Sequence, residues 1–518
     1  MSTATTTDPR PLPTLPPHVG VVVVGAGLSG IGAGYRLQTE VPGRDYLVLE
    51  SRDVSGGTWD LFRYPGVRSD SDMYTLGYPF KPWQGDKTLA DGPSILAYVR
   101  QTAAEFGIDR HIRYGVRVVG ADFSRSTATW TLTLERRGEG GTETTTMTCD
   151  FLYSCAGYYS YETPYAPAFE GLETYAGQVV HPQFWPEDLD YAGKRVVVIG
   201  SGATAVTLVP AMADAAAHVT MLQRSPTWIA ALPGRDPIAA RLKALLPEQL
   251  AYRAIRAKNI AWTTGFYQFC QRAPKAAGRS ILGLTTRIIG DEQIVAEHFT
   301  PSYNPWDQRL CAVPDADLFR SIKRGDAEVV TDTIARFVPE GIELTSGRVL
   351  EADLVVTATG LQLLAFGGIE LHVDGVAVPL SEEFVWQGAL VTGVPNFAVC
   401  IGYTNASWTL RADLTTRLVC KVLKWMDRHD YAAAEPTPDP GLTERPLLAL
   451  AAGYVQRSIA AFPKQGDSGP WRVRQNYLLD AATTMRRSLD KSLTPTPRSA
   501  VRRAPSVAGT AAAEALTR

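Results

Sequence analysis

The sequence contains two glycine-rich segments of the same layout, each placed where a buried strand would turn into a helix. The first is GAGLSG at residues 25–30, and the second is GSGATA at residues 200–205. An apolar run precedes each of them, at residues 19–24 and, after Arg195 at its start, at 195–199. Strands buried on both faces have such runs, which are typical of parallel sheets covered by helices. The chain is therefore expected to contain two similar α/β units.

Each glycine-rich segment is followed by the helix and the second strand of a βαβ unit. The sequence predicts a helix at 31–40 and a strand at 46–50 in the first unit, and a helix at 203–213 and a strand at 218–223 in the second. In Rossmann-like domains the turn lets backbone amides approach a diphosphate, which the helix N-terminus stabilises. The predicted diphosphate-binding residues are Gly25, Gly27, Leu28, Ser29 and Gly30, and Gly200, Gly202, Ala203, Thr204 and Ala205.

The two units differ at the end of their second strand. Glu50 ends that strand in the first unit, where a carboxylate accepts hydrogen bonds from a ribose and repels a 2′-phosphate. In the second unit Gln223 is followed by Arg224 and Ser225, and a cation with amide and hydroxyl donors suits a 2′-phosphate. The contrast favours FAD or NAD in the first unit and NADPH in the second.

Composition excludes several other classes of protein. Among 518 residues, 51 are Lys or Arg and 53 are Asp or Glu, so the net charge of -2 does not indicate a nucleic-acid partner. The six cysteines form no CxxC pair and the seven histidines show no metal-binding spacing. We expect no metal site, no disulfides and a cytoplasmic location. No run reaches the roughly 18 apolar residues of a membrane span, and a soluble protein is expected.

Changes in periodicity divide the chain. Alternating residues at 129–134 predict antiparallel strands, a helical period dominates 237–325, and residues 351–360 return to a strand followed by glycine. The predicted fold is α/β, with two Rossmann-like dinucleotide-binding domains and a helical insertion. The predicted parts are a disordered arm at 1–17, an FAD-binding domain at 18–165 and 361–486, an NADPH-binding domain at 166–229 and 326–360, the insertion at 230–325, and a disordered tail at 487–518.

The segment between the two units resembles a known family signature, FxGxxxHxxxW followed by Pro or Asp. Tyr175, Gly177, His181, Trp185 and Pro186 match it, with Tyr in place of Phe. The chain thus resembles class B flavoprotein monooxygenases of the Baeyer-Villiger type, over about residues 18–480. Segments that resemble the ethionamide-activating branch of mycobacteria are 60–78, 304–311 and 402–408, and GGTW at 56–59 and YPG at 64–66 extend the likeness.

The resemblance implies a mechanism. NADPH reduces bound FAD, and the reduced flavin reacts with O2 to give a C4a-peroxyflavin. This oxidant converts ketones to esters or lactones and also oxidises sulfides or thioamides.

The resemblance also assigns roles to individual residues. Arg309 matches the catalytic arginine of the family, and Asp70 matches the flavin-proximal aspartate that orients it. Gln308 stands where related enzymes often have Lys, which leaves recognition of the NADPH phosphate to Arg224. His181 and Trp185 are predicted to form a hinge between the domains. Further predicted cofactor contacts are Gly57, Thr58, Trp59, Asp70, Tyr74, Val118, Thr359 and Gly360, and Tyr403 and Trp408 are predicted to line the substrate pocket.

Three alternatives stay open at this point. One is an N- or S-oxygenase that forms no ester. A flavin disulfide reductase would need a redox-active cysteine pair, for which Cys149 and Cys155 have unsuitable spacing. The third is a membrane-associated flavoprotein anchored by the apolar run 260–270, which is bracketed by cations. We favour a buried insertion helix for this run, which would shape the substrate entrance. The bracketing cations are Arg253, Arg256, Lys258, Arg272 and Lys275.

Overall fold

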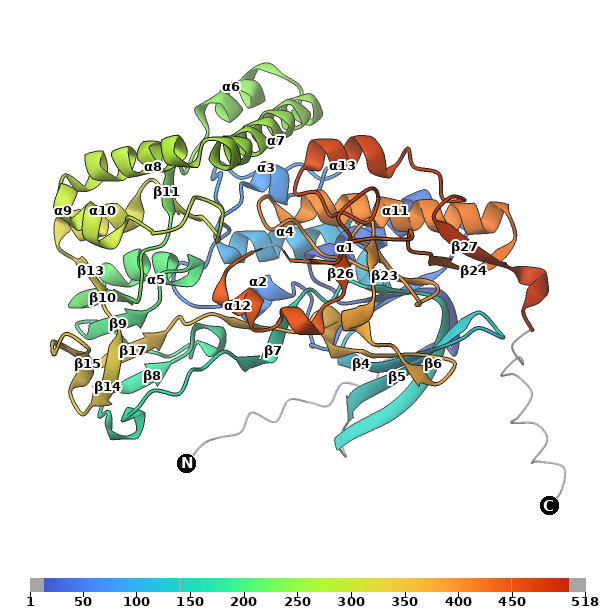
Figure 1. The fold of residues 1–518 in the computed structure, drawn as a ribbon, viewed down its shortest axis with the longest axis horizontal. Coiled ribbons are helices and arrows are strands. Elements are labelled where there is room, and N and C mark those ends of the chain that lie inside the picture. Colours follow the sequence, from blue (N-terminus) through green and yellow to red (C-terminus); the bar gives the residue numbers. More distant parts are fainter. Residues whose placement is uncertain (1–13, 139–140, 449, 503–518) are drawn as a thin grey trace.

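The molecule has two lobes, which lie on the right and the left of Figure 1. Strand β1 (His18–Val24) organises the first lobe, and all of its residues after His18 are buried. The computed structural model describes residues 14–138, 141–448 and 450–502. β1 pairs in parallel with β2 (Tyr46–Leu49) on one side and with β6 (Gly141–Ser154) on the other. Helix α1 (Leu28–Glu40) connects β1 to β2. The predicted first βαβ unit is therefore present in the structure.

An antiparallel meander extends this sheet beyond β6. Strands β4 (Val116–Ser124) and β5 (Thr129–Gly138) pair antiparallel with each other, and β5 pairs antiparallel with β6. This arrangement agrees with the alternating residues that predicted antiparallel strands. The smaller elements of the lobe are α2 (Thr58–Leu61), α3 (Met73–Leu76), α4 (Gly92–Glu105), β3 (Ile112–Arg113), β19 (Glu370–Val373), β20 (Val376–Ala377), β21 (Val385–Trp386) and β22 (Leu390–Val391).

The chain returns to the first lobe after completing the second. Strand β23 (Phe397–Val399) pairs in parallel with β6, and helix α11 (Trp408–Arg428) packs against α1. Arg36 of α1 and Asp413 of α11 form an ion pair at 2.8 Å. The first lobe is thus built from two segments that are far apart in the sequence.

The second lobe contains a five-stranded parallel sheet in the order β13-β10-β9-β17-β8. Helix α5 (Ala203–Ala213) connects β9 to β10, with the same bounds as the helix predicted there. A small antiparallel sheet of β14 (Ile334–Val338), β15 (Gly341–Leu344) and β16 (Val349–Glu351) precedes β17. The parallel strands are β8 (Gln178–Val180), β9 (Arg195–Ile199), β10 (His218–Gln223), β13 (Ala327–Thr331) and β17 (Leu354–Thr357).

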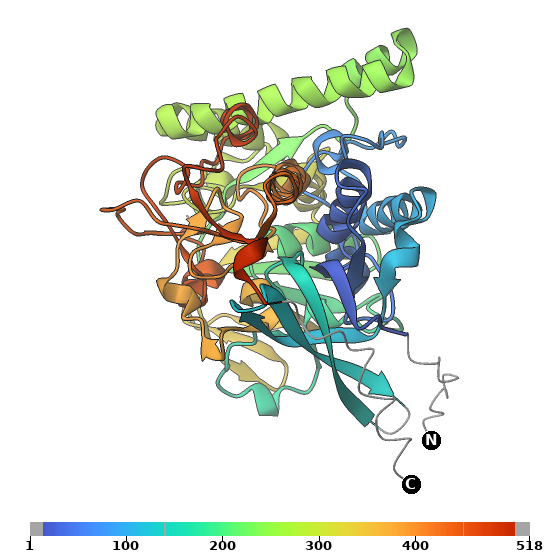
Figure 2. The same cartoon turned by 90° about the vertical axis from the view of Figure 1, so that its right-hand side faces the viewer.

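Helices interrupt the second lobe between β11 (Ile229–Leu232) and β12 (Cys311–Pro314), which pair in parallel. Helices α6, α7 and α8 form a ridge along one side of the molecule, at the top of Figures 1 and 2. Among the described residues, none of the helices combines the length and the apolar character needed to cross a membrane. The helices between these strands are α6 (Pro237–Leu245), α7 (Glu248–Arg272), α8 (Pro274–Ile289) and α9 (Glu292–His298), and α10 (Asp317–Arg324) follows β12.

Polar side chains of α7 attach the ridge to the first lobe. The buried Arg256 donates hydrogen bonds to the carbonyl oxygens of Tyr74 and Gly77, at 2.7 and 2.8 Å. Asn259 donates to Oδ1 of Asp72 at 2.8 Å. Because Asp72 caps the N-terminus of α3, the insertion helix is joined to the loop that carries Asp70.

Part of each end that was predicted to be disordered is ordered in the structure. Residues 487–502 include β27 (Leu493–Pro497), which pairs antiparallel with β24 (Tyr431–Pro436). Lys421 of α11 donates to the carbonyl of Arg487, and Trp425 donates to Asp490. At the other end, the carbonyl of Pro17 accepts a hydrogen bond from the amide of Thr148. Composition alone therefore misled the prediction at 14–17 and 487–502, and residues 1–13 and 503–518 lie outside the described residues.

The burial of Leu493 allows a test of this tail. Leu493 is 3% exposed and belongs to the core of the first lobe. Replacing it with Ala is expected to lower the free energy of unfolding by about 2–5 kcal/mol, because the cavity adds to the lost apolar burial. Chemical denaturation measures the change, with the exposed Lys491→Ala as control. Equal stability of the two variants would contradict a structural role for β27.

Candidate active site

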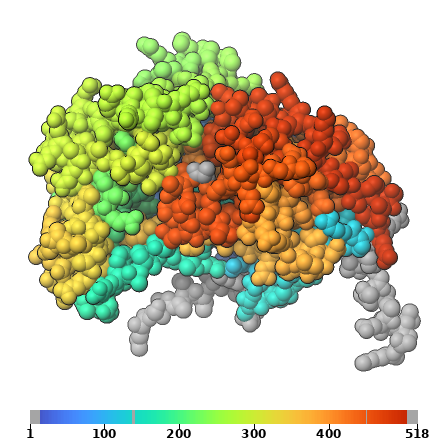
Figure 3. Space-filling view, viewed as in Figure 1, coloured from blue at the N-terminus to red at the C-terminus, as the bar shows by residue number. Residues whose placement is uncertain are grey.

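A cavity of about 690 Å³ lies where the two lobes meet. Its lining includes the residues that directly follow β1, β6, β9 and β17, so it lies at the carboxyl ends of these strands. Figure 3 shows the surface hollowed where the second lobe meets the C-terminal segments of the first. Open α/β sheets bind their ligands at this edge. Both glycine-rich turns face the same cavity.

The first turn requires glycine because its backbone is closely packed. A Cβ atom on Gly30 would overlap the carbonyl oxygen of Gly25, which itself has a φ of 99°. Glu50 is 5% exposed and accepts hydrogen bonds from the amides of Ala26 at 2.7 Å and Arg52 at 2.9 Å. Burial raises the pKa of Glu50, and these amides offset part of the effect. The carboxylate thus borders the cavity and also braces the turn.

In the second lobe an arginine follows the second strand of the βαβ unit. Arg224 is exposed, lines the cavity and forms no hydrogen bond or ion pair with any residue that the structure describes. Gln223 was predicted to offer an amide donor to the phosphate. Its side-chain amide instead donates to the carbonyl of His298 and to Thr331 inside the second lobe. Ser225 is exposed and does not line the cavity. Of the residues predicted to bind a 2′-phosphate at this strand end, Arg224 is the one that borders the cavity, and its role stays a prediction.

Replacing Arg224 with Gln is expected to raise the KM for NADPH about 10- to 100-fold, because a charge-assisted hydrogen bond to the 2′-phosphate is lost. The KM for NADH should not change, since that cofactor has a hydroxyl group at this position. Initial rates with both cofactors measure the effect, and the exposed Arg110→Ala serves as control. An equal increase in the KM for NADPH and the KM for NADH would argue against a phosphate contact.

Arg309 and Asp70 meet at the cavity although 239 residues separate them. Nε and Nη2 of Arg309 both donate to Oδ2 of Asp70, at 2.9 and 2.7 Å. Asp70 raises the pKa of the Arg309 guanidinium well above its ordinary value, despite the opposing effect of burial. The Arg309 side chain keeps 34% of its surface exposed where it borders the cavity. Arg309 thus presents a permanently charged guanidinium to the cavity, and Asp70 orients it.

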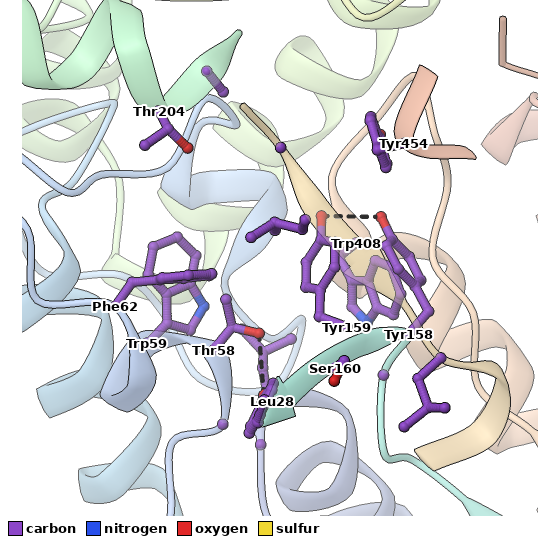
Figure 4. A pocket seen from close by; sticks show the side chains of 18 of the residues that line it. Leu28, Thr58, Trp59, Phe62, Tyr158, Tyr159, Ser160, Thr204, Trp408 and Tyr454 are labelled. Atoms are coloured by element: carbon purple, nitrogen blue, oxygen red, sulfur yellow. Dashed lines mark hydrogen bonds between the residues drawn. The ribbon is translucent and has the colours of Figure 1, made fainter. Parts of the chain in front are cut away.

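Aromatic side chains line the cavity near Arg309, and Figure 4 shows Tyr158, Tyr159 and Trp408 close together. Tyr454, Tyr159 and Tyr158 all interact electrostatically with Arg309. The hydroxyl oxygens of Tyr158 and Tyr159 are 3.5 Å apart, and Tyr158 also packs against Trp408. Burial raises the pKa of Tyr159 well above its ordinary value and that of Tyr454 to about 12, so both phenols are neutral donors at neutral pH. Nε1 of Trp408 donates to Ser29 in the first turn at 2.7 Å.

The family signature at 175–186 forms part of the second lobe. Its strand β8 is the edge strand beside β17, and the Tyr175 hydroxyl donates to the carbonyl of Ala352 at 3.0 Å. The tyrosine that replaces phenylalanine therefore adds a hydrogen bond. Nδ1 of His181 accepts from the amide of Gln183, and Trp185 packs edge-to-face against Tyr191. Neither His181 nor Trp185 lines the cavity, and their hinge role remains a prediction.

His181 also supports a prediction on pH dependence. Burial lowers its pKa from 6.5, and backbone groups of Gly360 and Tyr165 offset part of that effect. The unfolded chain therefore binds a proton at higher pH than the folded chain, so this contribution to stability falls as the pH drops below 6.5. Tm should decrease less in His181→Gln than in the wild type between about pH 7.5 and about pH 5.5. Equal decreases would exclude His181 as a source of this dependence.

Most of the predicted site residues lie around the cavity, together with Tyr403 and Trp408. Six others do not. Gly30 and Ala205 lie behind the turns, where they control helix packing, and His181, Trp185 and Ser225 are described above. The prediction that Tyr74 contacts a cofactor is corrected, because Tyr74 is buried beside Tyr252 of α7 and does not line the cavity. The predicted residues that line the cavity are Gly25, Gly27, Leu28, Ser29, Glu50, Gly57, Thr58, Trp59, Asp70, Val118, Gly200, Gly202, Ala203, Thr204, Arg224, Arg309, Thr359 and Gly360.

The sequence analysis missed the tyrosines around Arg309. Tyr158 and Tyr159 follow β6 after a short connection, and the carboxyl end of a parallel strand is where site residues gather. That rule could have identified both. Tyr454 lies in the short helix α12 (Gly453–Gln456), and no motif marks it.

Two glycine-rich turns facing one cavity, with Glu50 in one lobe and Arg224 in the other, define an oxidoreductase with two dinucleotide-binding domains. The two cysteines weighed for a disulfide reductase do not meet at this site, since Cys155 lines the cavity and Cys149 does not.

Comparisons with known proteins agree with this class. Residues 78–236 match the family model of flavin-binding monooxygenase-like proteins, and residues 23–83 match an NAD(P)-binding Rossmann-like domain. FAD-containing monooxygenase EthA of Mycobacterium tuberculosis is 50% identical over 91% of this chain and 96% of its own length. Putative FAD-containing monooxygenase MymA of the same organism is 48% identical, with the same shares covered. The chain belongs to this family of FAD-containing monooxygenases.

A solved structure of a steroid monooxygenase bound to NADP shares the fold. Its TM-score is 0.72 at 23% identity, and the match covers 93% of this chain and all of that one. The predicted family and fold class are confirmed.

Proposed function

We propose that this flavin monooxygenase holds FAD in the first lobe and NADPH in the second, and inserts an oxygen atom into ketones to give esters or lactones. The Arg309–Asp70 pair supports this proposal, because Asp70 holds the cationic side chain of Arg309 at the junction of the two proposed dinucleotide sites. In the overall reaction one atom of O2 enters the product. The other oxygen atom is reduced to water, which takes up the hydride of NADPH and one proton. Thioamides and sulfides are proposed as further substrates through oxidation at sulfur.

The residues present fit FAD in the first lobe. A Cβ atom on Gly27 would lie 3.5 Å from Cα of Gly57, so the absence of side chains keeps the space beside the helix N-terminus open. Gly57 has a φ of 57°, a conformation that favours glycine. Glu50 at the end of β2 suits a ribose. When bound, the flavin supplies hydride acceptance and activation of O2.

Arg309 contributes charge rather than a proton, because guanidinium groups are not deprotonated in proteins. A fixed cation stabilises negative charge that develops on oxygen in a site with little water. Asp70 orients this cation through a single oxygen atom. Tyr159 and Tyr454 are neutral donors beside it, and the proposed role of these phenols is to hydrogen-bond a substrate carbonyl.

The experiment is anaerobic mixing of the purified protein with NADPH or NADH, followed by ¹⁸O-labelled O2 with ketones, sulfides and thioamides. NADPH should bleach the flavin faster than NADH, and mass spectrometry should find one labelled oxygen atom in an ester. Failure of NADPH to reduce the flavin would refute the cofactor assignment. Labelled sulfoxides without any ester would refute oxygen insertion into ketones.

A further inference from the structure

Exposed apolar side chains concentrate on the ridge formed by α6, α7 and α8. In the described part of the chain, eight of the thirteen large hydrophobic residues that are exposed lie on these helices and on α13 (Tyr477–Thr484). Leu245 is 79% exposed and Trp262 is 68% exposed. Tyr477 of α13 packs in one cluster with Ile260 of α7, so Leu478 and Leu479 adjoin the same ridge. The six on the ridge itself are Ile238, Leu245, Leu250, Trp262, Phe269 and Leu284.

Helix α7 has two sides of different character. Arg256 and Asn259 are buried and bond to the first lobe, as described above. Trp262 and Phe269 are exposed and seven residues apart, so they lie on the same side of the helix. Only Ile260 and Cys270 of the apolar run at 260–270 are buried. The expectation that the whole run is a buried insertion helix is therefore wrong for Trp262 and Phe269.

The charge of the ridge is strongly one-sided. Residues 237–290 contain nine Lys and Arg residues but only one acidic residue, Glu248, in a chain whose net charge is -2. Six of these cations are exposed and form no ion pair with any described residue. They are Arg241, Arg253, Arg272, Lys275, Arg279 and Arg287. Exposed aromatic and aliphatic groups beside unpaired cations are typical of helices that lie in the interface of an anionic bilayer.

We propose that the ridge docks peripherally on anionic phospholipid membranes, with Trp262 and Phe269 in the headgroup region and the unpaired cations at the lipid phosphates. Charge complementarity favours this occupant over a second copy of the chain. A symmetric dimer through this face would bring the same cations together, and such like-charge contacts are costly.

Docking would also place the cavity near the membrane. Ile260 of α7 packs in one cluster with Tyr403, which lines the cavity. One helix diameter of about 10 Å then separates the cavity wall from the lipid. An apolar substrate dissolved in the bilayer would have a short path to the site. The docking itself does not depend on the proposed reaction.

Flotation of the FAD-loaded protein with vesicles tests the proposal. The protein should float with vesicles of phosphatidylcholine and phosphatidylglycerol, should float less with phosphatidylcholine alone, and should be released by salt. The double variant Trp262→Ser/Phe269→Ser should partition at least about tenfold less, since two apolar anchors are lost. The matched control Val376→Ser/Val349→Ser changes two exposed apolar residues elsewhere and should float like the wild type.

Gel filtration and FAD content accompany the assay, so that misfolded variants are recognised. Absence of binding to the anionic vesicles would overturn the proposal. Equal losses in the double variant and its control would overturn it too. A wild-type dimer that the double variant converts to a monomer would show that the face binds a second copy instead.

Discussion

Replacing Arg309 with Ala is expected to lower product formation from ketones about 10²- to 10³-fold, because removal of a fixed charge beside a developing oxyanion has effects of this size. FAD should stay bound, since Arg309 forms no bond with either glycine-rich turn. Arg309→Lys should fall between Ala and the wild type. A lysine keeps the charge but cannot reproduce the two donors that Nε and Nη2 direct at Asp70.

Ester yield per NADPH consumed is the deciding measurement for this series. Arg348→Ala is the control, since Arg348 does not line the cavity and pairs with Glu328 on the surface. An Arg309→Ala enzyme with wild-type ester yield would remove the arginine from its proposed role, while the cofactor assignment would stand.

Replacing Gly30 with Ala is expected to yield protein that binds FAD at least about tenfold more weakly, since overpacking against backbone costs more than about 1–3 kcal/mol. The added Cβ would overlap the carbonyl oxygen of Gly25 and push α1 away from β1. NADPH binding should be less affected, because the substitution lies in the first lobe. The second lobe has Ala205 at the equivalent position and is unchanged. Flavin absorbance per protein chain after purification measures the loss.

Gly43→Ala is the matched control, because Gly43 is exposed and its Cβ would have no neighbour within 4 Å. Full FAD content in Gly30→Ala would show that the close packing of helix on strand is not required for cofactor binding.

The elements that the sequence predicted best are those with local signals. The bounds of β9, α5 and β10 agree with the prediction, because buried strands and glycine turns leave a continuous pattern in neighbouring residues. The contrast between Glu50 and Arg224 was also readable, since both positions follow from strand length. Arg309 and Asp70 have no local signal in common. Only the family resemblance placed them together, and the structure then supplied their geometry.

Other features depend on contacts between distant segments. The tail at 487–502 has the composition of a disordered chain, yet Leu493 and its neighbours find partners in α11 and β24. Tyr454 reaches Arg309 from a short helix that no periodicity marks. Which side of α7 is exposed was equally hidden, because apolar residues at 260–270 occur on both sides of the helix.

The discontinuous first lobe imposes an order on biosynthesis. Its strand β1 leaves the ribosome early, but β23 and α11, which complete the lobe, are made only after the whole second lobe. Domains generally fold as units when their chain is complete. The second lobe, for which we propose NADPH, can thus acquire its core while the ribosome is still translating, whereas the proposed flavin site waits for β23 and α11. A ribosome that stalls between the two would release a chain with a finished second lobe and an exposed edge on β6.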